Sequence, residues 1–116
     1  MFLGSKSPTW FFVGLMLWCS SAAAQEIWVE GGLNCGTWVK TRTEHNSSNL
    51  EDYVVGFLNG LALGAKLEFW HAQLPDLQRE QAYLWLDNYC RANPLSQASG
   101  GIVKLFHERA VSIPQK

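Results

Sequence analysis

The chain has 116 residues, 9 of them basic and 10 acidic, so its formal net charge is −1. This balance excludes the broad basic surface by which nucleic-acid-binding proteins are recognised. A chain of this length forms one domain at most, and so small a domain buries a limited share of its surface and gains from covalent reinforcement.

The first 24 residues are organised like an export signal. Lys6 precedes an uncharged, largely apolar run at residues 10–18, and three alanines at 22–24 provide small residues for cleavage before Gln25. The run is about half the ~20 residues of a membrane-spanning helix, which disfavours an uncleaved anchor. Lipid attachment at Cys19 is disfavoured because bulky Trp18 directly precedes it.

We therefore expect a cleaved signal peptide at residues 1–24 and a mature, periplasmic chain of residues 25–116. Cleavage removes Lys6, one of the 9 basic residues, and none of the 10 acidic ones, so the mature net charge is −2. We expect no contact with the membrane after cleavage, and no nucleic-acid partner.

Two cysteines remain after cleavage, Cys35 and Cys90, and an even count in an oxidising compartment predicts a disulfide. Closing a loop of about 56 residues would contribute about 4 kcal/mol in the chain-entropy model. The alternatives are two separate buried thiols, or metal ligation, although no further Cys or His stands at ligand spacing from either cysteine.

The first predicted helix covers residues 34–43. Asn34 is a suitable N-cap, and Cys35, Trp38 and Val39 fall on one side. The polar residues 44–49 predict a loop. The strongest strand signal in the mature chain is the short stretch at residues 27–30.

The second and longest predicted helix covers residues 50–71. Its apolar stripe consists of Leu50, Tyr53, Val54, Phe57, Leu58 and Leu61. Gly56, Gly60 and Gly64 follow one another at helical spacing, and each costs about 1 kcal/mol relative to alanine. Polar residues interrupt this run, so it is not a membrane helix-pairing motif. We expect the glycines to allow the close approach of another helix.

The third predicted helix starts near Pro75-Asp76, with Asp76 as N-cap, and ends at Ala92 because Asn93 precedes a proline. Its apolar face contains Ala82, Tyr83, Trp85, Leu86, Tyr89 and Cys90. Its polar face contains Glu80, Asp87, Asn88 and Arg91, with Leu84 exposed among them. Glu80 and Asp87, about two turns apart, are expected to be solvated and not to form an acid–base pair.

The fourth predicted helix covers residues 95–110. Its apolar face contains Leu95, Ala98, Ile102, Leu105 and Phe106. Gly100-Gly101 weakens the first half, so the stable part is expected to begin near Ile102. Together these elements predict an all-α fold: a small four-helix arrangement stapled by one disulfide, forming a single helical domain over residues 25–116.

The residue types of catalysis do not occur in the required patterns. His45, His71 and His107 are separated, without metal or triad spacing, and the serines lack a nucleophile elbow. The paired cysteines leave no free thiolate, and no haem or phosphate-binding motif is present. The sequence favours a protein that is not an enzyme and has no metal or cofactor.

Two apolar residues are candidates for partner contact. Trp28 precedes every predicted helix, where an aromatic side chain either covers the bundle or binds a partner. Leu84 lies on a polar helix face, and interface cores favour apolar anchors. The alternative for Leu84 is an ordinary exposed leucine, which is common on protein surfaces.

Three stretches together carry a family resemblance: CGTWVKTR at residues 35–42, YVVGFLNG at 53–60 and WLDNYCRANPL at 85–95. Their order resembles a group of small exported bacterial proteins that are similar to the Rap/Tai immunity proteins, which neutralise peptidoglycan amidase toxins delivered by type VI secretion. The resemblance implies an immunity-type inhibitor whose partner is such an amidase. The matching motifs are structural and include no toxin-contacting signature.

Two other functions stay open at this point. One is an acid-stress periplasmic chaperone similar to HdeA, which is also small, helical and disulfide-bonded and exposes apolar surface when acid dissociates its dimer. The other is an envelope component with neither toxin nor client. The expected partner is a protein, and a second copy of this chain is the alternative.

Overall fold

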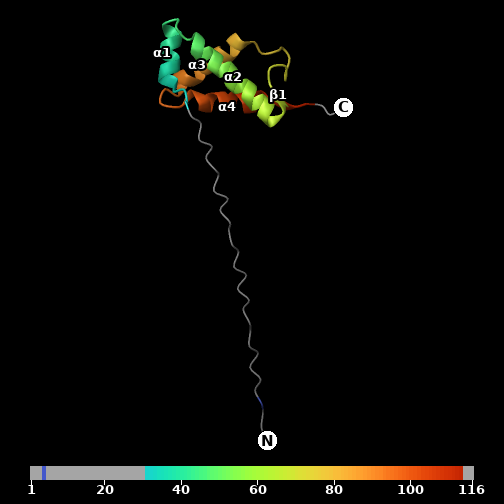
Figure 1. Ribbon diagram of the computed structural model, residues 1–116. Helices are drawn as coiled ribbons and strands as arrows, with labels where there is room; N and C mark the ends of the chain where they lie inside the picture. The colour runs from blue at the N-terminus through green and yellow to red at the C-terminus, as the bar shows by residue number, and fades with distance from the viewer. Residues whose placement is uncertain (1–3, 5–30, 114–116) are drawn as a thin grey trace.

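The computed structural model describes Gly4 and residues 31–113. The expected signal peptide at 1–24, the strand-like stretch at 27–30 and Trp28 lie outside the described residues. Within residues 31–113 the chain forms four helices and one two-stranded sheet (Figure 1). The all-α, disulfide-stapled fold is therefore confirmed. In this part of the chain no helix is long and apolar enough to cross a membrane.

Helix α1 (Cys35–Thr43) begins where its cap residue predicts. The Asn34 side-chain oxygen accepts a hydrogen bond from the Thr37 backbone N–H at 2.8 Å. This bond satisfies one of the amide donors that a helix start leaves free. Cys35 and Trp38 then point into the core, each with no exposed surface.

Helix α2 (Ser48–Ala65) begins earlier than predicted and ends well before His71. Lys66 adopts a left-handed backbone conformation, with φ 56°, and terminates it. The following strand β1 (Leu67–Glu68) pairs antiparallel with β2 (Val111–Ser112) near the chain end. This pairing takes residues 67–71 out of the helix and directs Phe69 into the core, where it is fully buried.

Helix α3 (Arg79–Ala92) starts later than predicted, and Asp76 is not its cap. The Gln81 side-chain oxygen instead accepts a hydrogen bond from the Gln78 backbone N–H at 2.8 Å. Asp76 lies 2.9 Å from the ring nitrogen of His71. Residues 69–78 are a connection and not helix, and the predicted end of α3 before Asn93-Pro94 is confirmed.

The side chain of Arg109, at the end of α4, holds this connection in place. Its guanidinium donates to the backbone oxygens of Phe69 at 3.0 Å, Gln73 at 3.1 Å, and Trp70 and Pro75, each at 3.3 Å. One side chain thus satisfies four carbonyl groups that no helix or strand would pair. The path of residues 69–78 depends on contacts far along the chain.

Helix α4 (Ala98–Arg109) starts after Leu95, which is fully exposed and not part of the apolar face. The helix also includes Gly100 and Gly101, earlier than the predicted stable part. Gly101 is buried because the Tyr89 ring of α3 lies against it: an added Cβ would come within 2.5 Å of that ring. The predicted apolar positions from Ala98 to Phe106 are buried.

The glycine series of α2 does not contact another helix, so that prediction is wrong. Gly56, Gly60 and Gly64 are exposed, and a Cβ added at any of them would meet no atom within 4 Å. The close approach of two helices occurs instead between α3 and α4, at Gly101.

A single core links the four helices. Helix α3 packs against α1 and α4, and α2 packs against α4. The buried core residues are Leu33, Cys35, Trp38, Val54, Leu58, Phe69, Ala82, Tyr83, Leu86, Cys90, Ala98, Ile102, Leu105 and Phe106. The predicted disulfide joins Cys35 to Cys90 inside this core, with a Cα–Cα distance of 4.9 Å.

Backbone hydrogen bonds reinforce the same corner of the fold. The Cys35 N–H donates to the Ser96 oxygen at 3.0 Å, and the Ala98 N–H donates to the Leu33 oxygen at 2.6 Å. The start of α1 is therefore fixed both to α3, by the disulfide, and to the connection between α3 and α4.

Candidate binding cleft

A buried carboxylate, Asp87 of α3, organises the region where α1, α2 and α3 meet. Asp87 is only 5% exposed, so the expectation of a solvated side chain is wrong. It accepts hydrogen bonds from the Trp38 indole N–H at 2.9 Å and from two guanidinium nitrogens of Arg42 at 3.0 and 2.9 Å. Its charge is thus compensated by a bidentate pair, the geometry that arginine forms best with carboxylates.

Arg42 connects all three helices. Its third donor nitrogen bonds Glu51 of α2 at 2.9 Å, and Glu51 also accepts from the Ser47 hydroxyl at 2.6 Å. The hydrogen bond to Asp87, aided by Glu51, raises the pKa of Arg42 above its usual value despite the opposing effect of burial. The guanidinium lies 5.6 Å from the centre of the Trp38 ring and 5.7 Å from that of Tyr83.

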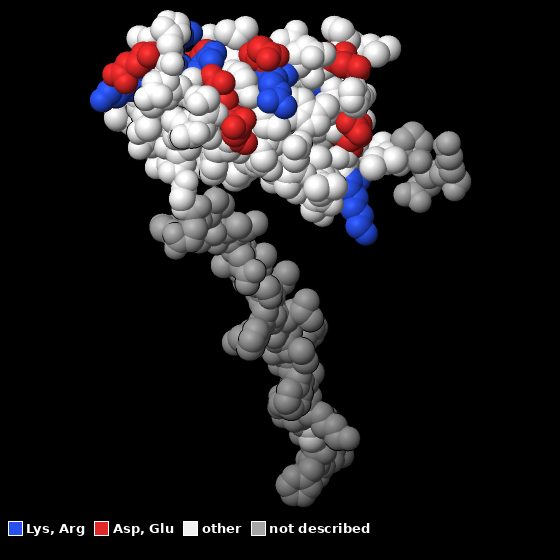
Figure 2. Space-filling model, turned by 45° about the horizontal axis from the view of Figure 1, so that its top comes forward, with Lys and Arg blue, Asp and Glu red and all other residues white. Residues whose placement is uncertain are grey.

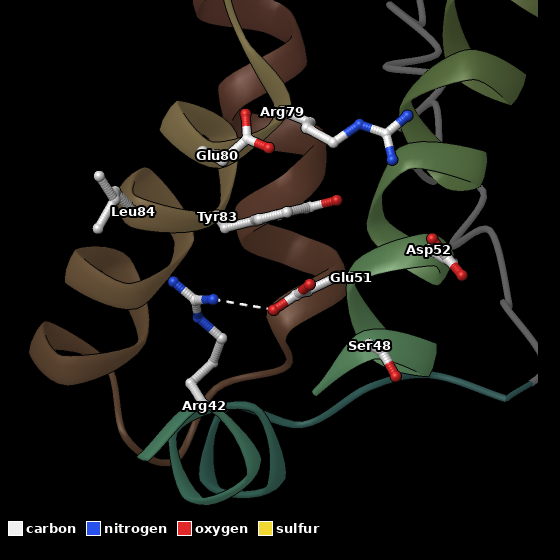
Figure 3. Close-up of a pocket in the computed structure, with 8 residues that line it drawn as sticks. All are labelled: Arg42, Ser48, Glu51, Asp52, Arg79, Glu80, Tyr83 and Leu84. Carbon is white, nitrogen blue, oxygen red and sulfur yellow. Dashed lines mark hydrogen bonds and ion pairs between the residues drawn. The ribbon is translucent and has the colours of Figure 1, made fainter. Parts of the chain in front are cut away.

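A cleft of about 450 Å³ lies beside this network (Figure 3). In Figure 3 the end of α1 forms its base, and α2 and α3 form its two sides. The lining residues are Arg42, Ser48, Glu51, Asp52, Arg79, Glu80, Tyr83 and Leu84. The volume is within the range of about 300–1,000 Å³ that is usual for ligand sites.

Tyr83 crosses the middle of the cleft. The residue is 4% exposed, and the one buried side-chain polar atom without a hydrogen-bond partner in the described part of the chain is not its hydroxyl but that of Tyr53 on α2. Figure 3 shows the Tyr83 hydroxyl pointing across the cleft toward α2. Burial raises the pKa of Tyr83, and the positive charge of Arg79 opposes that rise. At neutral pH Tyr83 thus offers an uncharged hydroxyl that can both donate and accept.

Leu84, predicted from the sequence as a partner contact, lies at the rim of this cleft and is 56% exposed. Its exposure was predictable because the helical period places it on the polar face of α3. The sequence did not predict that Arg42, Asp52 and Glu80 line one cleft, because they belong to three different helices. Trp28, the other predicted contact, is outside the described residues.

The position of Asp87 did leave a signal in the sequence. Asp87 stands four residues after Tyr83 and three before Cys90, which are both predicted to point inward. Residues at this spacing share one face of a helix. A carboxylate between two buried positions needs a cationic partner, and Arg42 supplies it.

A second, more apolar groove of about 650 Å³ lies at the other end of α2. It is lined by Asn59, Ala62, Leu63, Lys66, Leu67, Glu68, Trp70 and Ile113. Leu63 is 80% and Ile113 is 52% exposed. One wall is fixed by a 2.7 Å hydrogen bond from the Trp70 indole N–H to the Asn59 side chain.

The histidines do not form a site together. His45, His71 and His107 are all exposed and lie on different elements. Across residues 31–113 no group of three His, Cys, Asp or Glu side chains is placed to hold a metal ion. On the face shown in Figure 2, acidic and basic side chains are interspersed, and neither charge covers a broad area.

Comparison with known proteins identified no relative of this chain. No protein-family model, curated protein or solved structure matches the chain. Its function is therefore inferred from the cleft, the fold and the resemblance described for its sequence motifs.

Proposed function

We propose that this protein is a periplasmic binding protein that acts as an immunity-type inhibitor of a peptidoglycan amidase delivered by type VI secretion. The observation that carries the proposal is the cleft between α1, α2 and α3, with the exposed Leu84 at its rim. The organisation of the first 24 residues and the disulfide support an exported, oxidised protein. The resemblance to Rap/Tai immunity proteins supplies the class of partner.

The cleft suits recognition of a protein because its walls are fixed before a partner arrives. The Arg42 network ties α1 to α2 and α3, and the disulfide ties α1 to α3 a second time. A fixed surface loses less conformational entropy on binding than a flexible one does. A standard interface needs about 800 Å² on each partner, with a few central anchors that provide most of the binding energy.

The proposed action is occupation of the amidase surface, without turnover. Inhibition should therefore be stoichiometric: residual amidase activity should fall linearly with added protein and vanish near an equimolar ratio. The cellular counterpart is growth of cells that export the amidase toxin, with and without this protein.

A matched pair of variants tests the role of the cleft face. Leu84→Glu should abolish inhibition, since it replaces the proposed apolar anchor at the rim of the cleft by a charge. Leu95→Glu makes the same change at a fully exposed leucine in the connection between α3 and α4, and should inhibit like the wild type. Equal inhibition by both variants, or no inhibited amidase at all, would contradict the proposal.

A second candidate function, an acid-stress chaperone, is favoured by the apolar groove at the end of α2. Its exposed Leu63 and Ile113 could contact unfolded clients. This function predicts that the protein keeps client proteins soluble near pH 3 and inhibits no amidase. A protein that does neither would be an envelope component with neither a toxin nor a client.

A further inference from the structure

Exposed apolar side chains gather at the end of the molecule opposite α1 (Figure 1). Of the six large apolar residues that are exposed in the described part of the chain, four lie at this end: Leu63, Leu74, Val111 and Ile113. Leu63 and Ile113 line the apolar groove, and Val111 belongs to β2, which pairs with β1. Leu74 is 92% exposed and lies between Gln73 and Pro75, whose carbonyl groups are both held by Arg109 just before β2. Such a concentration of apolar surface is typical of a face that another molecule covers.

The walls of the apolar groove are fixed by contacts within the chain. The Trp70 indole N–H donates to the Asn59 side chain of α2 at 2.7 Å. Arg109 donates to the backbone oxygens of Phe69 and Trp70, at 3.0 and 3.3 Å. A surface that is fixed in advance loses little conformational entropy when it is covered. The groove can therefore meet a folded surface without rearranging.

The charges in the groove indicate what kind of surface covers it. Lys66 and Glu68 both line the groove, so it has one positive and one negative group and no net charge. The ion pairs between described residues include neither of them. A surface with both signs can match a copy of itself, because a two-fold axis places the positive group of each copy opposite the negative group of the other.

Other occupants match this surface less well. Anionic lipid headgroups attract clusters of basic residues, and here one lysine is balanced by one glutamate. An unfolded apolar segment would cover Leu63 and Ile113 but would bring no opposite charges to Lys66 and Glu68. The whole chain has a net charge of −1, so two copies repel each other least through a neutral surface.

We propose that the apolar groove is the interface between two copies of this chain, related by a two-fold axis. Leu63 and Ile113 of each copy pack against the other copy, and Lys66 of each copy pairs with Glu68 of the second. The inference does not rest on the proposed immunity function, because the cleft beside Leu84 lies at the other end of α2. The two surfaces can be covered at the same time.

A matched pair of variants tests the apolar part of this interface. The mass of the oxidised mature protein is measured by analytical ultracentrifugation from micromolar to millimolar concentration, and the wild type should reach the mass of a dimer. Leu63→Glu should weaken dimerisation at least about a hundredfold, since a two-fold interface loses two buried leucines. Leu95→Glu makes the same change at a fully exposed leucine near the opposite end of the molecule, and should dimerise like the wild type.

An exchange of charges tests the pairing of Lys66 with Glu68. Lys66→Glu leaves two carboxylates in the groove, and Glu68→Lys leaves two ammonium groups, so each variant alone should dimerise about tenfold more weakly than the wild type. An equimolar mixture of the two variants should form a mixed dimer, because both pairs are then again of opposite charge. Circular dichroism checks that each variant is folded, since Glu68 also accepts a hydrogen bond from the His71 backbone N–H at 3.0 Å.

Three results would overturn the inference. The first is a wild type that stays monomeric at every concentration, including one that binds an unfolded client through the groove. The second is equal dimerisation of the Leu63→Glu and Leu95→Glu variants, which would place the interface elsewhere. The third is a mixture of the folded Lys66→Glu and Glu68→Lys variants that associates no better than either variant alone.

Discussion

At the scale of single residues, Asp87 links the core to the candidate binding surface. A carboxylate removed from water is costly unless charged and polar donors replace the lost hydration. Trp38 and Arg42 supply three such donors, and the same arginine then reaches Glu51. The position of α1 against α2 and α3 is therefore set by a polar group inside an otherwise apolar core.

Asp87→Asn tests this dependence. The amide cannot accept from both guanidinium nitrogens and leaves Arg42 with reduced compensation. The free energy of unfolding should fall by about 2–3 kcal/mol, below the range for breaking a fully buried pair because Arg42 is partly exposed. Urea denaturation followed by circular dichroism measures the change, with the exposed Glu108→Gln as control. A loss below about 0.5 kcal/mol, typical of surface substitutions, would contradict the assigned role.

Tyr83 makes a prediction for alkaline pH. Its pKa is raised above 10.0 in the folded state, chiefly by burial, so the folded protein holds the phenolic proton more tightly than the unfolded chain. This contribution to stability is complete below pH 10 and is lost as the pH rises above it. Between pH 9 and pH 11, the wild type should lose more stability than Tyr83→Phe, which has no such proton. Parallel urea midpoints for the two proteins across this range would contradict the prediction.

At the scale of secondary-structure elements, the sequence predicted the helix ends that local residues determine and missed those that long-range contacts determine. Helix α1 was predictable because Asn34 caps it from within its own sequence. The end of α2 was not, because pairing of β1 with β2 near the chain end converts residues 67–68 to strand. The start of α3 was displaced for a similar reason, since Arg109 of α4 holds the preceding connection. Periodicity finds a helix, and tertiary contacts decide where it stops.

The glycines of α2 show that sequence spacing alone does not tell which side of a helix contacts another helix. Helical spacing places Gly56, Gly60 and Gly64 near one another, but it does not say whether that side meets a neighbour or solvent. The same uncertainty affected Gly101, whose role against Tyr89 depends on how α3 and α4 cross. Which glycine needs to lack a side chain is thus a property of packing.

Two alanine substitutions of opposite effect test this assignment. Gly60→Ala should stabilise the protein by about 1 kcal/mol, since the new Cβ meets no atom within 4 Å and alanine is the better helix former. Gly101→Ala should destabilise it by about 1–3 kcal/mol, because the Cβ would collide with the Tyr89 ring. Urea midpoints measure both. A destabilised Gly60→Ala would restore the originally predicted helix contact at that position.

At the scale of the whole molecule, the fold was more predictable than the site. Four amphipathic segments and one pair of cysteines are sufficient to predict a helical domain with a disulfide, because each of these features can be read from a short stretch of sequence or from composition. The cleft is lined by Arg42, Asp52 and Glu80 from three different helices, an arrangement that no pattern along the chain encodes. Leu84 was predicted to be exposed because exposure follows from the helical period, whereas the burial of Asp87 became clear only when its partners Trp38 and Arg42 were known.

The disulfide acts on the whole molecule, because it closes most of the described chain into one loop. In a small domain the core alone provides limited stability, and a cross-link of this span restricts the unfolded chain strongly. Cys35→Ser should therefore lower the free energy of unfolding by about 2–5 kcal/mol. Cys90→Ser and the double variant should lose a similar amount, since all three remove the same bond.

Urea denaturation of the oxidised and reduced wild type, beside the three variants, measures this contribution. Reduction should move the midpoint of the wild type to that of the double variant. Mass spectrometry of the oxidised mature protein should show a mass about two hydrogens lower. Neither cysteine should react with an alkylating reagent in the unfolded, unreduced protein, because both sulfurs are held in the bridge and neither is a free thiol. Two thiols that react in the unreduced protein, or an oxidised wild type no more stable than the double variant, would show that the helices hold together without the bridge.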